Sequence, residues 1–218
     1  DLLEREPIKL DERNVNKQLR GKVALVTGAA GSIGSELVRQ ISKFSPKKIN
    51  ALDQAESPLY ELEYELSMDR EKNIYEIVIG DIRHEERMEN LFRVFKPEIV
   101  FHAAAYKHVP MMEENPSEAI RTNVHGTKIV ADLSVKYGVK KFVMVSTDKA
   151  VNPTSVMGAS KRIAEIYTQS ADKTCDTSFI TTRFGNVLGS NGSVIPIFKK
   201  QIESGGPVTV THPEVTRY

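Results

Sequence analysis

The sequence predicts an α/β protein in which a doubly wound parallel sheet carries helices on both faces. Residues 22–27 (KVALVT) form a continuous apolar run, which is the pattern of a strand buried on both faces. From there to residue 183, short apolar runs alternate with segments of helical periodicity. Such alternation specifies a parallel sheet with right-handed crossovers. After residue 185 the regularity falls, and we expect the start of a smaller substrate lobe there.

Each expected element follows from its own pattern. The helix after the first run carries apolar residues at helical spacing from Ile33 to Ile41. A long helix at residues 115–137 is opened by Pro116 and closed by Gly138, which suits the position just past a helix end. Strands are expected at residues 22–27, 48–53, 74–79, 98–103, 141–146 and 178–183. Helices are expected at residues 32–43, 59–70, 85–95, 115–137 and 156–171, followed by a helix at 194–204 and a short strand at 208–211.

Composition excludes several classes of protein. Lys plus Arg number 30 against 29 acidic residues, and this balance argues against a nucleic-acid-binding surface. The single cysteine, Cys175, excludes an internal disulfide framework and fits a reducing compartment. No stretch approaches the roughly 20 apolar residues of a membrane span. No spacing of Cys, His and carboxylates suggests a metal site.

The 218 residues divide into three expected parts. Residues 1–20 are charge-dense and are predicted to be an N-terminal arm or linker. Residues 21–184 hold the sheet, and residues 185–218 are predicted to be a truncated part of a substrate-binding region. Because the chain begins at Asp1 without Met, we expect a piece of a longer protein.

A glycine-rich turn follows the first predicted strand. Its glycines, Gly28, Gly31 and Gly34, have the spacing G-x-x-G-x-x-G. The first permits a tight turn, the second lets the backbone approach a pyrophosphate, and the third lets the helix pack close to the strand. Free N–H groups at the start of the next helix would attract phosphate. The turn therefore predicts a Rossmann-type dinucleotide site built from Gly28, Ala30, Gly31, Ser32, Ile33 and Gly34.

An acidic residue ends the second predicted strand. Asp53 lies 19 residues after Gly34, where a carboxylate accepts hydrogen bonds from the adenosine ribose and repels the 2′-phosphate of NADP. The predicted cofactor is therefore NAD rather than NADP. Asp81, after the third strand, resembles a residue that contacts adenine, and Ile82 would pack on the ring. The alternatives are that Asp53 only caps the next helix and that Gly80-Asp81 is a simple turn.

Further motifs carry a family resemblance. The sequence is similar to the extended short-chain dehydrogenases/reductases, and more closely to the polysaccharide-biosynthesis group of nucleotide-sugar 4,6-dehydratases, in its membrane-linked branch with Met in place of Tyr. The resemblance covers roughly residues 1–218 and implies a UDP-N-acetylglucosamine 4,6-dehydratase-like lyase of surface polysaccharide or capsule biosynthesis. The motifs that carry it are residues 102–110 (HAAAYKHVP), 122–127 (TNVHGT), 146–154 (STDKAVNPT), 157–162 (MGASKR) and 183–187 (RFGNV).

The resemblance implies a catalytic group at the end of the fifth strand. Asp148 would be the general acid that protonates the leaving C6 hydroxyl, and Lys149 the base that removes the C5 proton. Met157 stands where the superfamily pattern Y-x-x-x-K has its tyrosine, and Met has no ionisable group. Either Thr147 or Asp148 must then assist removal of the C4 hydroxyl proton, and a hydroxyl such as Thr147 is better suited to orienting it. The alternative is that residues 147–149 are only a polar turn and helix cap.

Other positions complete the expected site. Lys161 lies on the same helix face as Met157 and would bind the nicotinamide ribose. Three alanines after the fourth strand, Ala103, Ala104 and Ala105, are expected at the cofactor. Expected contacts of the nucleotide-sugar substrate are Lys107, Asn123, Arg183 and Asn186, with Asn123 also expected to hydrogen-bond between a helix and a strand. His102 and His108 are either ligands or packed or solvated side chains.

Two competing functions stay open. A nucleotide-sugar epimerase or reductase relies on the tyrosine, so Met157 counts against it. A non-catalytic NAD(H)-binding domain would keep the glycine turn and Asp53 without a use for residues 148–149. The resemblance of residues 1–11 to a segment that follows a membrane region implies a cytoplasmic catalytic domain of a protein anchored in the bacterial inner membrane. The sequence does not specify the oligomeric state, and a homo-oligomer is one of the alternatives.

Overall fold

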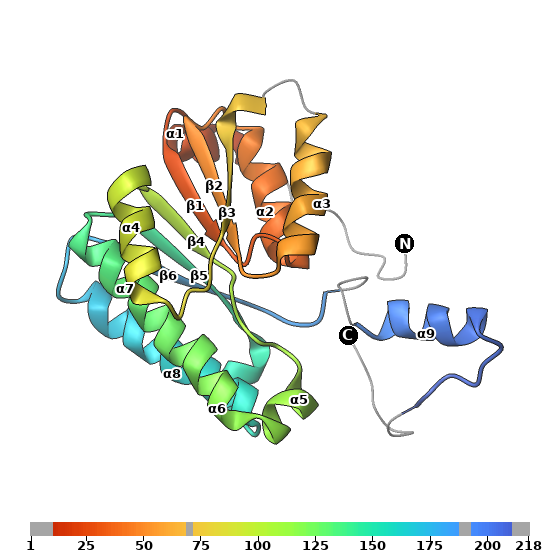
Figure 1. The fold of residues 1–218 in the computed structure, drawn as a ribbon. Coiled ribbons are helices and arrows are strands. Elements are labelled where there is room, and N and C mark those ends of the chain that lie inside the picture. The colour runs from red at the N-terminus through yellow and green to blue at the C-terminus, as the bar shows by residue number, and fades with distance from the viewer. Residues whose placement is uncertain (1–10, 69–71, 188–192, 211–218) are drawn as a thin grey trace.

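A computed structural model describes residues 11–68, 72–187 and 193–210. Its centre is a parallel sheet of six strands in the order β3-β2-β1-β4-β5-β6, with helices on both faces (Figure 1). The predicted α/β class and doubly wound parallel sheet are therefore confirmed. The strands are β1 (Val23–Thr27), β2 (Lys48–Asp53), β3 (Tyr75–Ile79), β4 (Ile99–His102), β5 (Lys141–Thr147) and β6 (Ser178–Phe184).

Helices cover the sheet in two layers. In Figure 1, α2 and α3 lie on one side of the sheet, and α4, α7 and α8 on the other. The helices are α1 (Glu12–Leu19), α2 (Ser32–Ser42), α3 (Glu56–Ser67), α4 (Glu85–Phe95), α5 (Val109–Glu114), α6 (Pro116–Ala119), α7 (Thr127–Lys136), α8 (Val156–Asp172) and α9 (Val194–Glu203). Shorter turns are η1 (Lys72–Ile74), the π-helical η2 (Ile120–Gly126) and η3 (Asp148–Ala150).

The continuous apolar runs are explained by burial on both faces. Along β1, Leu25 packs into the core on the α4, α7 and α8 side, whereas Ala24 and Val26 pack into the core on the other side. Successive strand residues point to opposite faces, so a strand between two helical layers needs apolar residues at every position. This arrangement fixes the carboxyl ends of β1 and β4 side by side, where the strand order reverses.

Most expected elements are present within a few residues of their expected ends. The long helix expected at residues 115–137 is divided into α6, the wider π-helical η2 and α7. The pattern did not predict α5, which is only six residues long. The short strand expected at 208–211 is wrong for residues 208–210, which are exposed and lie in no strand, while residue 211 is outside the described part. Val208 and Val210 have apolar character but no sheet edge beside them in the described part of the chain.

The two ends of the described chain differ. The helix α1 packs on the domain, since Leu19 is buried in the core beside Val15. Residues 1–10 of the expected arm lie outside the described residues. In contrast, α9 has no buried residue and lies away from the sheet in Figure 1. Among the described helices, none combines the length and apolar character needed to cross a bilayer.

Candidate active site

A cleft lies at the carboxyl edge of the sheet, at the reversal of strand order between β1 and β4. Open α/β sheets bind ligands at this kind of position. One cavity of about 420 Å³ is walled by the glycine turn, the loop after β4, the end of β5, α8 and residues 184–187. A second cavity of about 140 Å³ adjoins it, and both have Gly28, Gly31 and Tyr106 in their walls.

The glycine turn is shaped by close backbone contacts. Gly28 has φ +70°, and a Cβ there would lie 2.6 Å from the backbone N of Ala104. A Cβ on Gly34 would lie 1.9 Å from the backbone O of Gly28. Glycine is therefore required at both positions, and the start of α2 approaches the cleft with Ser32 and Ile33 in its wall. This geometry fits a bound pyrophosphate.

Asp53 joins the glycine turn to the second cavity. Its Oδ2 accepts a hydrogen bond from the backbone N of Ala30 at 2.9 Å, and its Oδ1 accepts one from the backbone N of Ala55 at 2.9 Å. Ala30 therefore contributes through its backbone, on the Asp53 side of the turn. Asp53 also lines the second cavity, so it both orders the turn and borders the place expected for the adenosine.

The far wall of the second cavity holds the residues expected at adenine. Asp81 and Ile82 line it together with Ala104. Asp81 forms an ion pair with Arg83 at 2.6 Å. Partial burial raises the pKa of Asp81, but the hydrogen bonds and charge of Arg83 outweigh this and hold the pKa below its usual value. Asp81 is therefore an ionised acceptor.

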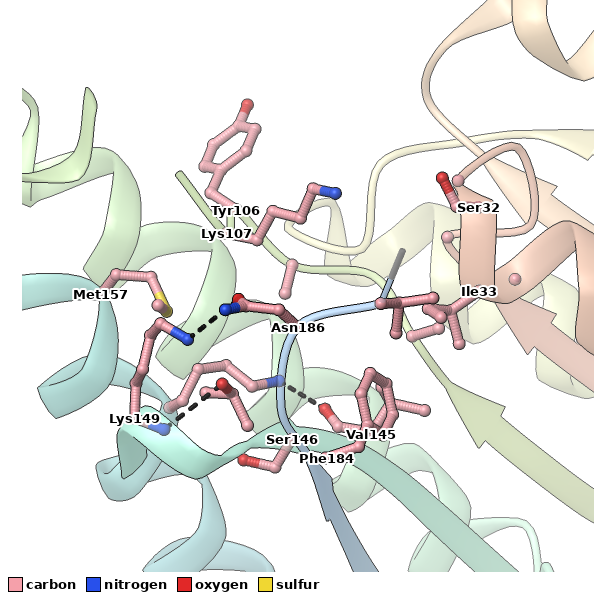
Figure 2. Close-up of a pocket in the computed structure, with 18 of the residues that line it drawn as sticks. Ser32, Ile33, Tyr106, Lys107, Val145, Ser146, Lys149, Met157, Phe184 and Asn186 are labelled. Atoms are coloured by element: carbon pink, nitrogen blue, oxygen red, sulfur yellow. Dashed lines mark hydrogen bonds between the residues drawn. The ribbon is translucent and has the colours of Figure 1, made fainter. Parts of the chain in front are cut away.

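The end of β5 brings the expected catalytic residues together. Thr147 Oγ1 donates a hydrogen bond to Asp148 Oδ1 at 2.9 Å, and Lys149 Nζ lies 3.1 Å from the same oxygen. Lys149 Nζ also donates to Asn186 Oδ1 at 3.4 Å. Figure 2 shows Lys149 reaching toward Asn186 beside Met157. Thr147, Lys149 and Asn186 line the large cavity, while Asp148 lies between the first two along the chain.

The ion pair determines the charge of Asp148 in the free protein. Partial burial raises the pKa of Asp148, but hydrogen bonds from Lys149 and Thr147 outweigh it and hold the pKa below its usual value. A general acid needs a raised pKa, whereas Lys149 and Thr147 lower the pKa of Asp148. Asp148 is therefore a carboxylate that can accept a proton before it donates one.

Met157 and Lys161 lie on the buried face of α8 and both line the large cavity. Lys161 Nζ donates to the carbonyl O of Val145 at 2.7 Å. Burial lowers the pKa of Lys161 to about 8, and the charge of Glu165 opposes that shift. Met157 packs with Met112 and Ala119 in a small apolar cluster, with Tyr106 against it.

Two of the expected substrate contacts lie outside the walls of the two cavities. The fully buried Asn123 side chain bonds the backbone N and O of Tyr106, at 2.8 and 3.0 Å, and the hydroxyl of Ser160. Arg183 directs Nε and Nη2 to Glu165. Neither lines either cavity of the cleft. In the free protein, the polar atoms of both side chains therefore support the cavity wall from inside the protein. Lys107 and Asn186 do line the large cavity.

The two histidines differ. His102 is fully buried and its ring nitrogens lie 2.8 Å from the hydroxyls of Thr27 and Thr127. Burial, with the charge of Lys161, lowers the pKa of His102 to about 3, so it is neutral and part of the core. His108 lines the large cavity. Within the described ranges, no group of three or more His, Cys, Asp or Glu residues has a metal-binding arrangement.

Other cavity residues were not expected from the sequence. Ser146, Tyr106 and Phe184 line the large cavity. Glu165 does not line it but binds Arg183, the residue before Phe184. Glu165 is detectable from its position four residues after Lys161, which places it on the buried helix face. The charged wall residues are cationic, since Lys107, Lys149 and Lys161 line the cavity and its described lining contains no carboxylate. Such a wall attracts an anionic ligand.

Comparison with known proteins places these features in context. The sequence model of a family described as polysaccharide biosynthesis protein matches residues 24–218. The chain is 56% identical, over its whole length, to the capsular polysaccharide biosynthesis protein CapD of Staphylococcus aureus, and it covers 37% of that protein. It is 38% identical to a UDP-N-acetylglucosamine 4,6-dehydratase (inverting) of Campylobacter jejuni, with 91% of the chain and 59% of that protein covered.

Related proteins of another activity also match. The UDP-glucose 4-epimerase of Rickettsia akari is 36% identical, over 90% of the chain and 58% of that protein. Among solved structures, the dTDP-glucose 4,6-dehydratase DesIV of Streptomyces venezuelae, with NAD and TYD bound, has a TM-score of 0.74 and 25% identity. That match covers 85% of this chain and 63% of DesIV. The chain thus spans 37 to 59% of the length of these curated relatives.

Proposed function

The chain belongs to the polysaccharide biosynthesis protein family, of the extended short-chain dehydrogenase/reductase type, and we propose that it is the NAD-binding part of a nucleotide-sugar 4,6-dehydratase. The proposed substrate is UDP-N-acetylglucosamine or a close analogue, and the product its 4-keto-6-deoxy sugar. One observation carries the proposal. Thr147, Lys149 and Lys161 line the same cavity as the glycine turn, so the residues proposed for catalysis and those proposed for the cofactor border one space.

NAD fits the residues present. Gly28 and Gly31 leave the backbone open to a pyrophosphate, and Asp53 borders the adjoining cavity where the adenosine ribose would lie. A relative solved with NAD bound supports the same choice. When bound, NAD supplies a hydride acceptor for C4 of the sugar and returns that hydride to C6.

The residues supply the proton transfers. The Asp148 carboxylate takes the C4 hydroxyl proton while Thr147 orients that hydroxyl, so Met157 need not ionise. Asp148 then gives this proton to the C6 hydroxyl, which leaves as water, while the neutral amine of Lys149 takes the C5 proton. Lys149 finally returns a proton to C5. Asp148 and Lys149 end in the states in which they began, so the scheme balances without net oxidation.

The ion pair sets a condition for this scheme. Lys149 accepts a proton only as the neutral amine, whereas the free protein holds it beside the Asp148 carboxylate at 3.1 Å. Substrate entry must therefore separate the pair and release the Lys149 proton.

Mass spectrometry of the reaction tests the proposal. The protein should convert UDP-N-acetylglucosamine to a product lighter by one water, because 4,6-dehydration removes water and no other atoms. An epimerase would instead yield an isomer of unchanged mass. Asp148→Asn is the matched inactive control. An unchanged mass spectrum with folded, NAD-loaded protein would contradict the proposal.

A further inference from the structure

We propose that Glu165 is a positioning residue that keeps Lys161 a cation in the cofactor cleft and ties the β6 wall of that cleft to α8. The proposal rests on the proposed function only where it concerns NAD. Its first part concerns the charge of one amine, and its second concerns how two elements are joined.

The Glu165 carboxylate is enclosed by two arginines. Its side chain is 0% exposed. It accepts hydrogen bonds from Arg183 Nε at 2.9 Å and from Arg183 Nη2 at 2.6 Å. Arg162 Nη1 adds a third contact at 3.1 Å. A two-pronged guanidinium pair of this kind fixes geometry as well as charge. A buried carboxylate without such partners would be strongly unfavourable.

The pair joins the two sides of the cleft. Arg183 is on β6, next to Phe184 and three residues before Asn186, and both of these line the large cavity. Glu165 is on α8, which carries Lys161 in the same cavity wall. The pair therefore holds the end of β6 against the helix that carries Lys161.

Glu165 is the carboxylate one helical turn after Lys161 on the buried face of α8. The two residues are one helical turn apart, at i and i+4, where side chains share a face. The hydrogen bond of Lys161 to Val145 goes to a neutral carbonyl, which does not compensate a buried ammonium. Burial lowers the pKa of Lys161 to about 8, and Glu165 supplies the attraction that opposes it.

Other charged and titratable groups around Lys161 do not replace Glu165. His102 on β4 is neutral. Asp148 is 56% exposed, so solvent screens its charge, whereas Glu165 is fully buried. The remaining groups on the surrounding elements are basic side chains, not carboxylates: Lys107 and His108 in the loop after β4, Lys149 in η3, Arg162 in α8 and Arg183 in β6. Among the described residues around this amine, Glu165 is thus the carboxylate left to attract it.

A titration of Lys161 tests the proposal without cofactor. The protein is labelled with ¹³C-lysine, the Lys161 signal is assigned with Lys161→Arg, and its chemical shift is followed from pH 6 to 11. Glu165→Gln should lower the midpoint by on the order of one pH unit, because the opposing charge is lost. Arg183→Lys is the matched control, since it breaks the two-pronged geometry but keeps the charge. Both should destabilise the fold, yet the control midpoint should stay within a few tenths of a unit.

The outcomes separate electrostatic from merely structural support. An unchanged midpoint in Glu165→Gln, or equal shifts in both variants, would overturn the proposal. Should Glu165→Gln not fold, Arg162→Gln replaces it. That change removes a positive neighbour of the carboxylate, so the Lys161 midpoint should rise, and an unchanged midpoint there would also overturn the proposal.

NAD binding is then measured on the same proteins. Affinity of the wild type should fall as pH rises through the Lys161 midpoint, and that of Glu165→Gln should fall at correspondingly lower pH. If NAD affinity depends on pH in the same way in the wild type and in Glu165→Gln, the proposed role of Glu165 in the cofactor cleft is wrong. Absence of NAD binding at every pH would instead contradict the proposed function, while the cofactor-free titration still decides the charge of Lys161.

Discussion

Lys149 Nζ lies 3.1 Å from Asp148 Oδ1, so the two groups assigned to proton transfer are ion-paired in the free protein. The pair keeps Asp148 ionised and ready to accept the C4 hydroxyl proton. It also keeps Lys149 from acting as a base until substrate separates the two. The same contact therefore favours the first step and must break before the second.

Removal of either partner should greatly slow dehydration while NAD binding persists. Asp148→Asn and Lys149→Ala should each lower kcat by about 10²- to 10⁴-fold, the usual contribution of a positioned acid or base. Both side chains are substantially exposed, at 56% for Asp148 and 40% for Lys149, so the fold should tolerate the changes. Steady-state turnover and calorimetric NAD titration check the two effects. Full turnover in both variants would refute the assignment.

A nonionisable substitute for Met157 should be tolerated. Met157→Leu keeps a similar volume in the cluster with Met112 and Ala119, and such exchanges usually cost less than about 1.5 kcal/mol of stability. We expect kcat within about tenfold of wild type, because no proton passes through this side chain. Lys161→Ala is the contrasting change on the same helix face, and it should weaken NAD binding. Complete loss of turnover in Met157→Leu, with a normal melting temperature, would show that the thioether itself is needed.

Asp53 should control both affinity for NAD and preference over NADP. Asp53→Ala removes the acceptor of the Ala30 and Ala55 backbone N–H groups, and loosens the turn. Leaving such donors unpaired costs roughly 1–3 kcal/mol, so NAD should bind about tenfold more weakly or worse. The NAD/NADP affinity ratio should also decrease. Titration of both cofactors measures this, with Glu61→Ala on the exposed face of α3 as the control. Equal ratios in wild type and variant would contradict the ribose assignment.

His102 should contribute to the acid sensitivity of the fold. Its pKa is lowered to about 3, below the unfolded value of about 6.5, because burial disfavours its charged form. A lowered histidine pKa stabilises the fold above pH 6.5, and this contribution is lost as pH falls toward 3. The free energy of unfolding is measured in urea for the wild type and for His102→Gln. Between pH 7 and pH 5 it should decrease less in the variant than in the wild type. Parallel curves for the two proteins would show that His102 is not buried neutral.

Much of the fold follows from local pattern, because buried parallel strands and amphipathic helices have distinct periods. The glycine turn, Asp53 and residues 147–149 could be placed because each lies at the carboxyl end of a strand or directly after it, and the carboxyl ends of parallel strands share one edge. The roles of Asn123 and Arg183 could not. Both are polar residues near that edge, and only packing shows that their hydrogen-bonding atoms turn inward, toward Tyr106 and Glu165. The ion pair of Asp148 also depends on side-chain geometry that spacing does not specify.

Isotope transfer tests the proposed dehydration most directly. UDP-N-acetylglucosamine deuterated at C4 is incubated with the protein in ordinary water, and the product is examined by mass spectrometry and NMR. The account predicts loss of one water, with the deuterium retained at C6. In D₂O, unlabelled substrate should gain deuterium at C5 through the Lys149 exchange step. A product that keeps its deuterium at C4, or that has the mass of an isomer, would contradict the account.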